Sequence, residues 1–147
     1  MGRVQATDCL IWVLILKHNM ELKSKTDKRI IIEGQVNGNT LYLLVDTGAS
    51  VGLIDYNQIR MYGIKKGKMF PSTLVGASGD MMAWHCYQLV DIGDKQVGQF
   101  LIADIDAVVR SIARETGITI SGILSLPQMA MLGATIDTEK KELIIKN

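Results

Sequence analysis

The 147-residue sequence predicts a single all-β domain with a few short helices. Short apolar runs recur along the chain, and turn signals rich in Gly, Asn and Asp separate most of them. The chain is long enough for one compact domain with a real core. It contains no internal repeat, low-complexity tract or linker, so we expect one β-rich unit.

The predicted strands are apolar or β-branched runs bounded by turn residues. Asn37-Gly38 is the strongest hairpin signal, because both residues tolerate positive φ. The glycine-flanked segment 76–79, Gly93-Asp94 and the charged segment 138–141 indicate three further turns. In chain order, the predicted strands span residues 28–36, 40–45, 51–54, 69–75, 80–92, 96–103, 118–124, 134–137 and 143–145.

Three short helices interrupt these strands. Asp55 can cap a helix over residues 56–62. Apolar residues recur at helical spacing between residues 104 and 117, which predicts an amphipathic helix that packs on the core. Pro127 can occupy the first turn of a third helix, which ends near Leu132.

Charge and cysteine content argue against several classes of protein. The formal net charge is +1 and the basic residues are spread along the chain, which argues against a nucleic-acid partner. We interpret the cluster of Lys65, Lys66 and Lys68 as a solvated loop. Cys9 and Cys86 are the only cysteines, so no disulfide framework is implied and a cytoplasmic location fits best.

The sequence suggests neither a metal site nor a cofactor. His85 and Cys86 are adjacent on a predicted strand, so their side chains point to opposite faces. They therefore neither chelate one ion together nor meet as a nucleophile and a base. P-loop, GxGxxG and HExxH motifs are absent from the sequence.

The N-terminal residues contain a continuous apolar run at positions 9–16. It is too short for a membrane span, which needs about 20 residues. Asp8 before it and Lys17 after it make a poor signal peptide, and no small-residue cleavage site follows, although secretion or anchoring stays open. The run is a strand that packs on the domain or on a second subunit, or else it precedes a true start at Met20. We expect an extension over residues 1–27 and a domain over residues 28–147.

The segment LYLLVDTGAS, residues 41–50, places a carboxylate at the end of an apolar strand. Gly48 allows the backbone to turn sharply and its N–H to approach Asp46, and the Thr47 hydroxyl can fix the loop. Two carboxylates about 3 Å apart share one proton and can activate a water between them for amide hydrolysis. Asp-Thr-Gly occurs once in the chain, so the second carboxylate must come from a second copy on a twofold axis.

These residues resemble the retropepsin-like aspartic proteases, which are single-domain, homodimeric relatives of pepsin. LLVDTGAS at 43–50 is similar to their active-site strand and loop, and VGASGDMM at 75–82 is similar to their glycine-rich flap hairpin. ISGILSLPQMAMLGATID at 120–137 is similar to their third conserved element. The resemblance covers about residues 28–147 and implies a closed, barrel-like half-domain that is active as a twofold homodimer.

The resemblance also implies roles for individual residues. Asp46 supplies half of the catalytic dyad, Thr47 bonds across the twofold axis, and Gly48 presents its backbone to the water and the substrate. The hairpin closes over an extended polypeptide, which binds as an added strand. Met81, Met82 and Trp84 pack the hairpin or line the cleft. The expected substrate-binding residues are Ala49, Ser50, Val75, Gly76, Ala77, Ser78 and Gly79.

The sequence departs from the family pattern at one position and differs from the pepsin pattern at another. Ser125 stands where the family has a Gly, so we expect different packing behind the active-site loop. Ala49 stands where pepsin-like enzymes have a hydroxyl residue that bonds the dyad, which resembles the retroviral pattern. We therefore expect activity at weakly acidic to near-neutral pH.

Three functions stay open from the sequence. The first is an aspartic endopeptidase that acts as a homodimer on polypeptides. The second is a catalytically silent module of the same fold, which dimerises or holds peptides. The third is a zymogen in which residues 1–27 shield the cleft or the dimer interface. For the dimer, we expect residues 143–145 to pair across the interface with residues 10–16 or with a strand near Lys28.

Overall fold

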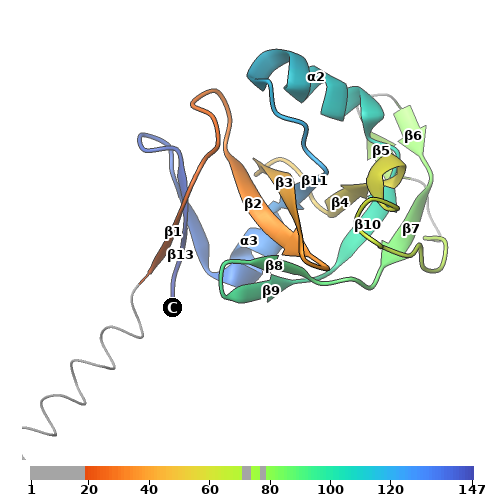
Figure 1. Cartoon of the computed structure of the whole chain (residues 1–147), viewed down its shortest axis with the longest axis horizontal. Coiled ribbons are helices and arrows are strands. Elements are labelled where there is room, and N and C mark those ends of the chain that lie inside the picture. Colours follow the sequence, from red (N-terminus) through yellow and green to blue (C-terminus); the bar gives the residue numbers. More distant parts are fainter. Residues whose placement is uncertain (1–18, 71–73, 77–78) are drawn as a thin grey trace, which may run out of the picture.

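A computed structural model describes residues 19–70, 74–76 and 79–147 of the chain, and these form a mostly β fold (Figure 1). The helical elements in these ranges are η1 (Tyr56–Gln58), α2 (Asp106–Thr116) and α3 (Leu126–Leu132). The strands are β1 (Met20–Lys23), β2 (Ile31–Val36), β3 (Asn39–Asp46), β4 (Gly52–Asp55), β5 (Leu74–Gly76), β6 (Gly79–Met81), β7 (Ala83–Cys86), β8 (Val90–Ile92), β9 (Lys95–Val97), β10 (Phe100–Ala103), β11 (Gly122–Ser125), β12 (Ala134–Asp137) and β13 (Glu142–Ile145).

An eight-stranded sheet forms the body of the molecule and curls into a half-barrel, with the order β7-β10-β4-β11-β3-β2-β8-β9. β3 lies between β2, its antiparallel hairpin partner, and β11, which runs parallel to it. This register places Ser125 opposite Asp46 at the end of β3. The all-β prediction is confirmed, and the sheet brings the end of β11 beside the predicted catalytic carboxylate.

The alternation of side chains in β2 and β3 divides the core between the two faces of the sheet. Ile32, Leu41 and Leu43 belong to the larger apolar cluster inside the half-barrel. Ile31 and Leu44 belong to a second cluster on the other face, which packs against α2. The hairpin has the predicted turn, with φ of 50° at Asn37 and 80° at Gly38.

The helix α2 covers the outer face of β2, β3 and β11, as the apolar periodicity predicts (Figure 1). Val109 and Ile112 are its buried residues, and Gly117 ends it in the left-handed conformation at φ 77°. The predicted third helix also forms, as α3, with Pro127 in its first turn. None of the helices within the described residues has the length and apolar character that a membrane crossing requires.

A separate three-stranded sheet joins the two ends of the described chain in the order β1-β13-β12. β12 and β13 match the predicted C-terminal strands, and β13 is the central strand of this sheet. β1 falls within residues 1–27 and pairs with β13 from Met20 to Lys23, a strand that the sequence analysis did not anticipate. Within one chain β13 pairs with β1 on one edge and with β12 on the other, and its pairing across a dimer interface stays a prediction. The apolar run at 9–16 lies outside the described residues.

Several elements are shorter than predicted. Of the strand predicted over residues 69–75, the described residues show β5 and an isolated bridge between Met69 and Trp84, and residues 71–73 lie outside the described residues. The strands predicted over residues 80–92 and 96–103 are divided into β6 to β8 and into β9 and β10. The second division falls at Gln99, which has a positive φ of 61° and interrupts the extended backbone.

The helix predicted over residues 56–62 is only the 3₁₀ turn η1. Asp55 caps it as predicted, because its carboxylate accepts a hydrogen bond from the Asn57 N–H. The same carboxylate also accepts bonds from the Gln58 side chain and the Ile105 N–H. These contacts fix η1 against the start of α2, and Asp55 is 1% exposed, so it has a structural role.

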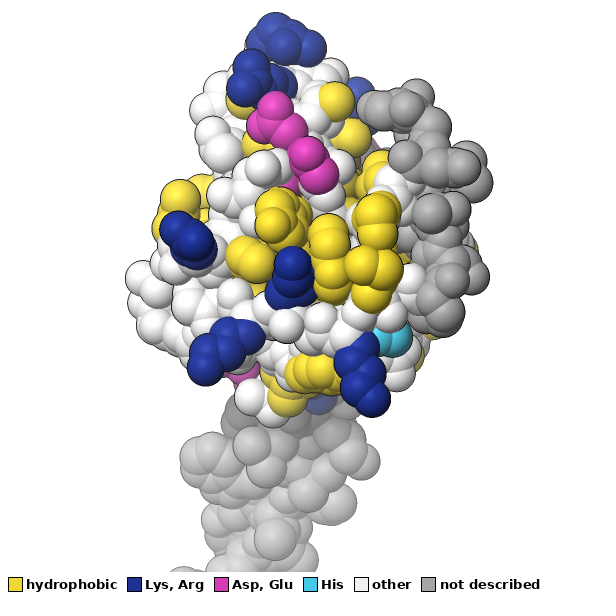
Figure 2. Space-filling view, turned by 90° about the vertical axis from the view of Figure 1, so that its right-hand side faces the viewer, with side chains coloured by type: hydrophobic (Ala, Val, Ile, Leu, Met, Phe, Trp, Pro, Cys, Tyr) yellow, Lys and Arg dark blue, Asp and Glu magenta, His cyan; other side chains and the backbone are white. Residues whose placement is uncertain are grey.

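One face of the molecule carries apolar side chains with basic side chains among them (Figure 2). Tyr56 and Trp84 stack on each other with ring centroids 5.2 Å apart. The Lys66 ammonium lies 4.4 Å from the centroid of the Trp84 ring, within cation–π range. Lys65, Lys66 and Lys68 are all exposed, which agrees with the interpretation of a solvated loop, and Lys66 in addition lies over side chains of η1 and β7.

Candidate active site

The Asp46 carboxylate occupies a defined position at the end of β3. Its Oδ1 atom accepts a hydrogen bond of 2.9 Å from the Gly48 N–H, and the Ala49 N–H donates to the Asp46 carbonyl at 3.2 Å. A Cβ at position 48 would lie 3.3 Å from the same carboxylate oxygen, so glycine keeps this approach open. Thr47 and Gly48 are exposed. The carboxylate is therefore held in place by a hydrogen bond from its own loop.

The active-site loop is supported from behind by β11 and α3. The Leu126 N–H donates to the Ala49 carbonyl at 3.1 Å, which ties the loop to the first residue of α3. Ser125 is the N-cap of that helix, and its hydroxyl accepts a hydrogen bond from the Gln128 N–H. In return, the Gln128 side chain accepts a hydrogen bond of 2.9 Å from the Ser125 N–H. This capping box explains the departure at position 125, because the serine supplies a helix cap that glycine cannot.

Gln128 links the active-site loop to two distant segments. Its side-chain amide donates to the Gly98 carbonyl at 2.8 Å, and the residue is 2% exposed. A Cβ at Gly52 would overlap this amide, so the start of β4 requires a glycine there. The sequence analysis missed Gln128 and Gly52 as supporting residues. The spacing Ser-x-x-Gln before an apolar helix was the readable signal for Gln128.

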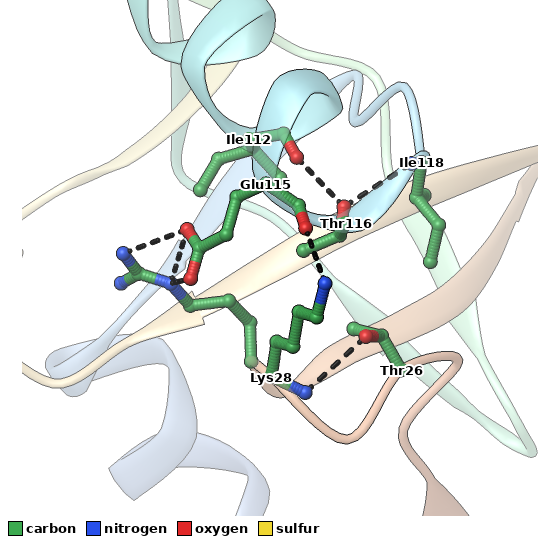
Figure 3. A network of polar contacts seen from close by, with 7 residues as sticks. Thr26, Lys28, Ile112, Glu115, Thr116 and Ile118 are labelled. Atoms are coloured by element: carbon green, nitrogen blue, oxygen red, sulfur yellow. Dashed lines mark hydrogen bonds and ion pairs between the residues drawn. The ribbon is translucent and has the colours of Figure 1, made fainter.

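An exposed polar network connects the start of β2 to the end of α2 (Figure 3). The Arg29 guanidinium bonds both carboxylate oxygens of Glu115, at 3.0 and 3.1 Å from Nε. Lys28 Nζ donates to the Glu115 carbonyl at 3.0 Å. The hydrogen bonds and the charge of Glu115 raise the pKa of Arg29, and the charge of Asp46 adds a smaller contribution. The guanidinium is thus part of the electrostatic surroundings of Asp46.

The hairpin that corresponds to the predicted flap follows the loop around Lys68. β5 pairs with β6 in antiparallel fashion, with Val75 opposite Asp80 and Gly76 opposite Gly79. Ala77 and Ser78, which the sequence analysis assigned to substrate binding, lie outside the described residues. These strands place the hairpin in the predicted part of the chain.

Met81, at the end of this hairpin, packs near the active-site loop. It belongs to the periphery of the cluster that includes Ala49 and also to that of the cluster that includes Val51. Met82, by contrast, is 50% exposed, and Trp84 stacks on Tyr56. Of the three residues that could pack the hairpin or line the cleft, Met81 is the one that packs on the same buried clusters as Ala49 and Val51.

Three further sequence predictions concern Ser50, the Cys86 thiol and a metal site. Ser50 is exposed and directly follows the loop. Burial raises the pKa of the Cys86 thiol, so this thiol is a poor nucleophile. Within the described residues, no group of three or more His, Cys, Asp or Glu side chains is placed to hold a metal ion.

Comparisons with known proteins address the family and the fold. Residues 32–122 match the family described as "gag-polyprotein putative aspartyl protease". No curated protein matches the sequence. The protease of EIAV, solved with the inhibitor HBY-793, is 18% identical with a TM-score of 0.58, covering 79% of this chain and 99% of that chain.

Two further solved structures share the fold. A retropepsin-like aspartic protease from Rickettsia conorii is 20% identical with a TM-score of 0.53, covering 87% of this chain and 98% of that one. The retroviral protease-like domain of Ddi1 from Leishmania major is 15% identical with a TM-score of 0.55, covering 81% and 89%. At these identities the likeness establishes a retropepsin-like fold.

Proposed function

Because the chain belongs to the gag-polyprotein family of aspartyl proteases, we propose that it is an aspartic endopeptidase that acts as a twofold homodimer. The observation that carries this proposal is the fixed Asp46 carboxylate at the end of β3, bonded by the Gly48 N–H. One chain supplies one such carboxylate, and the chemistry needs two. The partner's loop completes the site on the twofold axis.

In the proposed mechanism, the two Asp46 carboxylates share one proton and hold a water between them. The ionised carboxylate takes a proton from this water as it attacks the scissile carbonyl carbon, and the protonated carboxyl donates to the carbonyl oxygen. The tetrahedral intermediate collapses when the newly protonated carboxyl gives its proton to the amide nitrogen and the carbon–nitrogen bond breaks. The other carboxylate takes a proton from one hydroxyl of the intermediate, which restores the shared proton of the dyad. Thr47 fixes the two loops across the axis, and Gly48 presents backbone to the reacting groups.

The proposed substrate is an extended polypeptide segment that lies across both Asp46 loops. Extended segments suit this site because strand-like backbone hydrogen bonds give affinity and side-chain pockets give preference. The hairpin of β5 and β6 closes over the segment and excludes water, which strengthens the electrostatic interactions inside. The residues proposed to contact the substrate are Ala49, Ser50, Val75, Gly76, Ala77, Ser78 and Gly79.

The three-stranded sheet suggests where the partner subunit binds. Both edges of β13 are occupied, by β1 and by β12, within the same chain. A second chain therefore adds to the outer edge of β1 or β12, or replaces β1 beside β13. Equilibrium sedimentation at micromolar concentration tests the dimer, and a purely monomeric protein would leave Asp46 without its partner.

The decisive test compares wild type with Asp46→Asn on a diverse peptide mixture, with products read by mass spectrometry. Asp94→Asn is the matched control, because this exposed aspartate lies in the turn between β8 and β9. We expect cleavage by wild type and by the control, and none by Asp46→Asn. The rate of cleavage should peak at weakly acidic to near-neutral pH, because Ala49 has no hydroxyl that could bond the dyad. A peak below about pH 3.5 would contradict this expectation.

The same assay separates the two alternatives that the sequence leaves open. If folded, dimeric wild type does not cleave, the silent module and the zymogen remain. Removing residues 1–18 then decides between them, since the zymogen gains activity on trimming. The cut must stop before Met20, because β1 pairs with β13 from that residue onward.

A further inference from the structure

We propose that a surface hollow between the loop after η1 and the segment after β7 docks an acidic segment of a partner polypeptide. The hollow has a volume of about 720 Å³. The residues that form its walls include Lys65, Lys66, Gly67, Tyr87, Leu89 and Gln96. None of the described residues around it belongs to the loop that carries Asp46 or to the hairpin of β5 and β6, so the inference does not depend on the proposed cleavage.

The wall formed by the loop after η1 is positively charged. The basic residues between positions 56 and 70 are Arg60, Lys65, Lys66 and Lys68. Neither Asp nor Glu occurs in this stretch, and none of these cations forms an ion pair with another described residue. Asp91 is the acidic residue among the described lining residues, and its Oδ1 atom accepts a hydrogen bond of 3.1 Å from the Gln96 amide. The lysines are therefore open to the carboxylates of a partner.

The lysine side of the hollow is held in place against β7. The Lys66 ammonium lies 4.4 Å from the centroid of the Trp84 ring and 5.5 Å from that of the Tyr56 ring. The Gly67 N–H donates to the His85 carbonyl at 2.9 Å, and a Cβ at position 67 would lie only 2.7 Å from that oxygen. Binding a partner therefore requires little ordering of this wall, which lowers the entropic cost of association.

The other side of the hollow offers apolar surface to the same partner. Tyr87 and Leu89 are 69% and 44% exposed. A segment that carries both carboxylates and apolar side chains would pair the carboxylates with Lys65 and Lys66 and remove this apolar surface from water. The hollow therefore fits a polypeptide segment in which Asp or Glu is mixed with apolar residues.

Other candidate occupants fit the hollow less well. A membrane surface is flat, whereas these lysines line a depression. Nucleobases bind by stacking on aromatic rings, but the rings here stack on one another, Tyr56 on Trp84 and His85 on Tyr87. Residues 1–18 of the chain itself contain two basic residues and one acidic residue, so their charge does not suit a basic wall.

The test measures binding by fluorescence anisotropy, with the full chain carrying Asp46→Asn so that no probe is cleaved. The probe is a labelled peptide of alternating Glu and Leu, and the matched peptide has Gln in place of Glu. We expect the Glu peptide to bind about tenfold more tightly than the Gln peptide, and this difference should shrink as salt is added.

Charge-reversing variants locate the binding site. Lys65→Glu with Lys66→Glu should weaken binding of the Glu peptide about tenfold. Lys140→Glu with Lys141→Glu is the matched control, because it changes the charge equally in the turn between β12 and β13, and it should keep the affinity. Lys65→Met with Lys66→Met keeps the alkyl stems and should also weaken binding, and it replaces the reversed variant if that protein does not fold.

Two sets of results would overturn the inference. In the first, the Glu peptide does not bind, binds no better than the Gln peptide, or loses as much affinity with the control variant as with the hollow variants. In the second, single-stranded DNA or phosphatidylserine vesicles bind more tightly than the Glu peptide and lose this binding in the Lys65 and Lys66 variants. Failure of the proposed cleavage is a separate result, because this experiment reads binding alone.

Discussion

Two polar networks join segments close to the strand that ends in Asp46, and they differ in burial. Ser125 and Gln128, behind the loop, are 1% and 2% exposed and form a closed set of hydrogen bonds with Gly98. Arg29 and Glu115, at the other side, keep 49% and 37% of their side-chain surface exposed. Both networks join segments that are far apart in sequence. Separation in sequence alone therefore does not explain how much each network contributes to stability.

The comparison teaches that burial decides how much each network contributes. A buried donor or acceptor that loses its partner leaves an unsatisfied group away from water, which costs about 1–3 kcal/mol. An exposed ion pair exchanges its partner for water, and its contribution is typically about 0–1 kcal/mol. We therefore expect the buried network to determine the geometry of the active-site loop, and the exposed one to contribute little to stability.

The largest effect is expected for Gln128→Ala. The change leaves the Ser125 N–H and the Gly98 carbonyl without their buried partner, so the free energy of unfolding should fall by about 3 kcal/mol. Denaturant unfolding measures this, with exposed Gln35→Ala as the matched control. A loss as small as that of the control would refute the idea that burial gives this network its weight.

Gly52→Ala should come next, because a Cβ at this position overlaps the Gln128 amide. We expect a loss of about 2 kcal/mol from overpacking. The double variant with Gln128→Ala should lose less than the sum of the two single changes, because the overlap disappears with the side chain. Strict additivity in this double-mutant cycle would show that the two residues do not interact as described.

A smaller effect is expected for Glu115→Gln in the exposed network. Unfolding free energy should fall by less than about 1 kcal/mol, and the difference should shrink as salt screens the ion pair. If the free energy of unfolding fell by more than about 2 kcal/mol, or if its fall did not change with salt, the exposed network would contribute as much to stability as the buried one.

The smallest effect on stability at neutral pH is expected from the Cys86 thiol. This group shows the effect of burial alone, without a hydrogen-bond network. Its pKa is raised in the folded protein because burial disfavours the thiolate. Stability from this group is present below the ordinary thiol pKa and is lost as pH rises, because the unfolded chain ionises first. Iodoacetamide at pH 8, with the Cys86 peptide followed by mass spectrometry, should modify folded protein far more slowly than denatured protein; equal rates would contradict this.

Much of the local structure could be predicted because adjacent residues encode it. The Asn37-Gly38 turn, the caps at Asp55 and Gly117, and the start of α3 at Pro127 all depend on contacts within a few residues. Strand lengths were less predictable. The positive φ at Gln99 divides an apolar run that otherwise reads as one strand, and the preceding Gly98 carbonyl is bonded by Gln128, which is distant in sequence.

The sequence by itself determined the family resemblance, the all-β class and the loop that holds Asp46, since the Gly48 bond to its carboxylate spans two residues. The tertiary structure decided that β11 lies beside β3, that β1 pairs with β13, and that Gln128 reaches Gly98 and Gly52. The physical reason is that pairing between distant strands depends on which faces are buried together. That choice is made by the whole core rather than by any one segment.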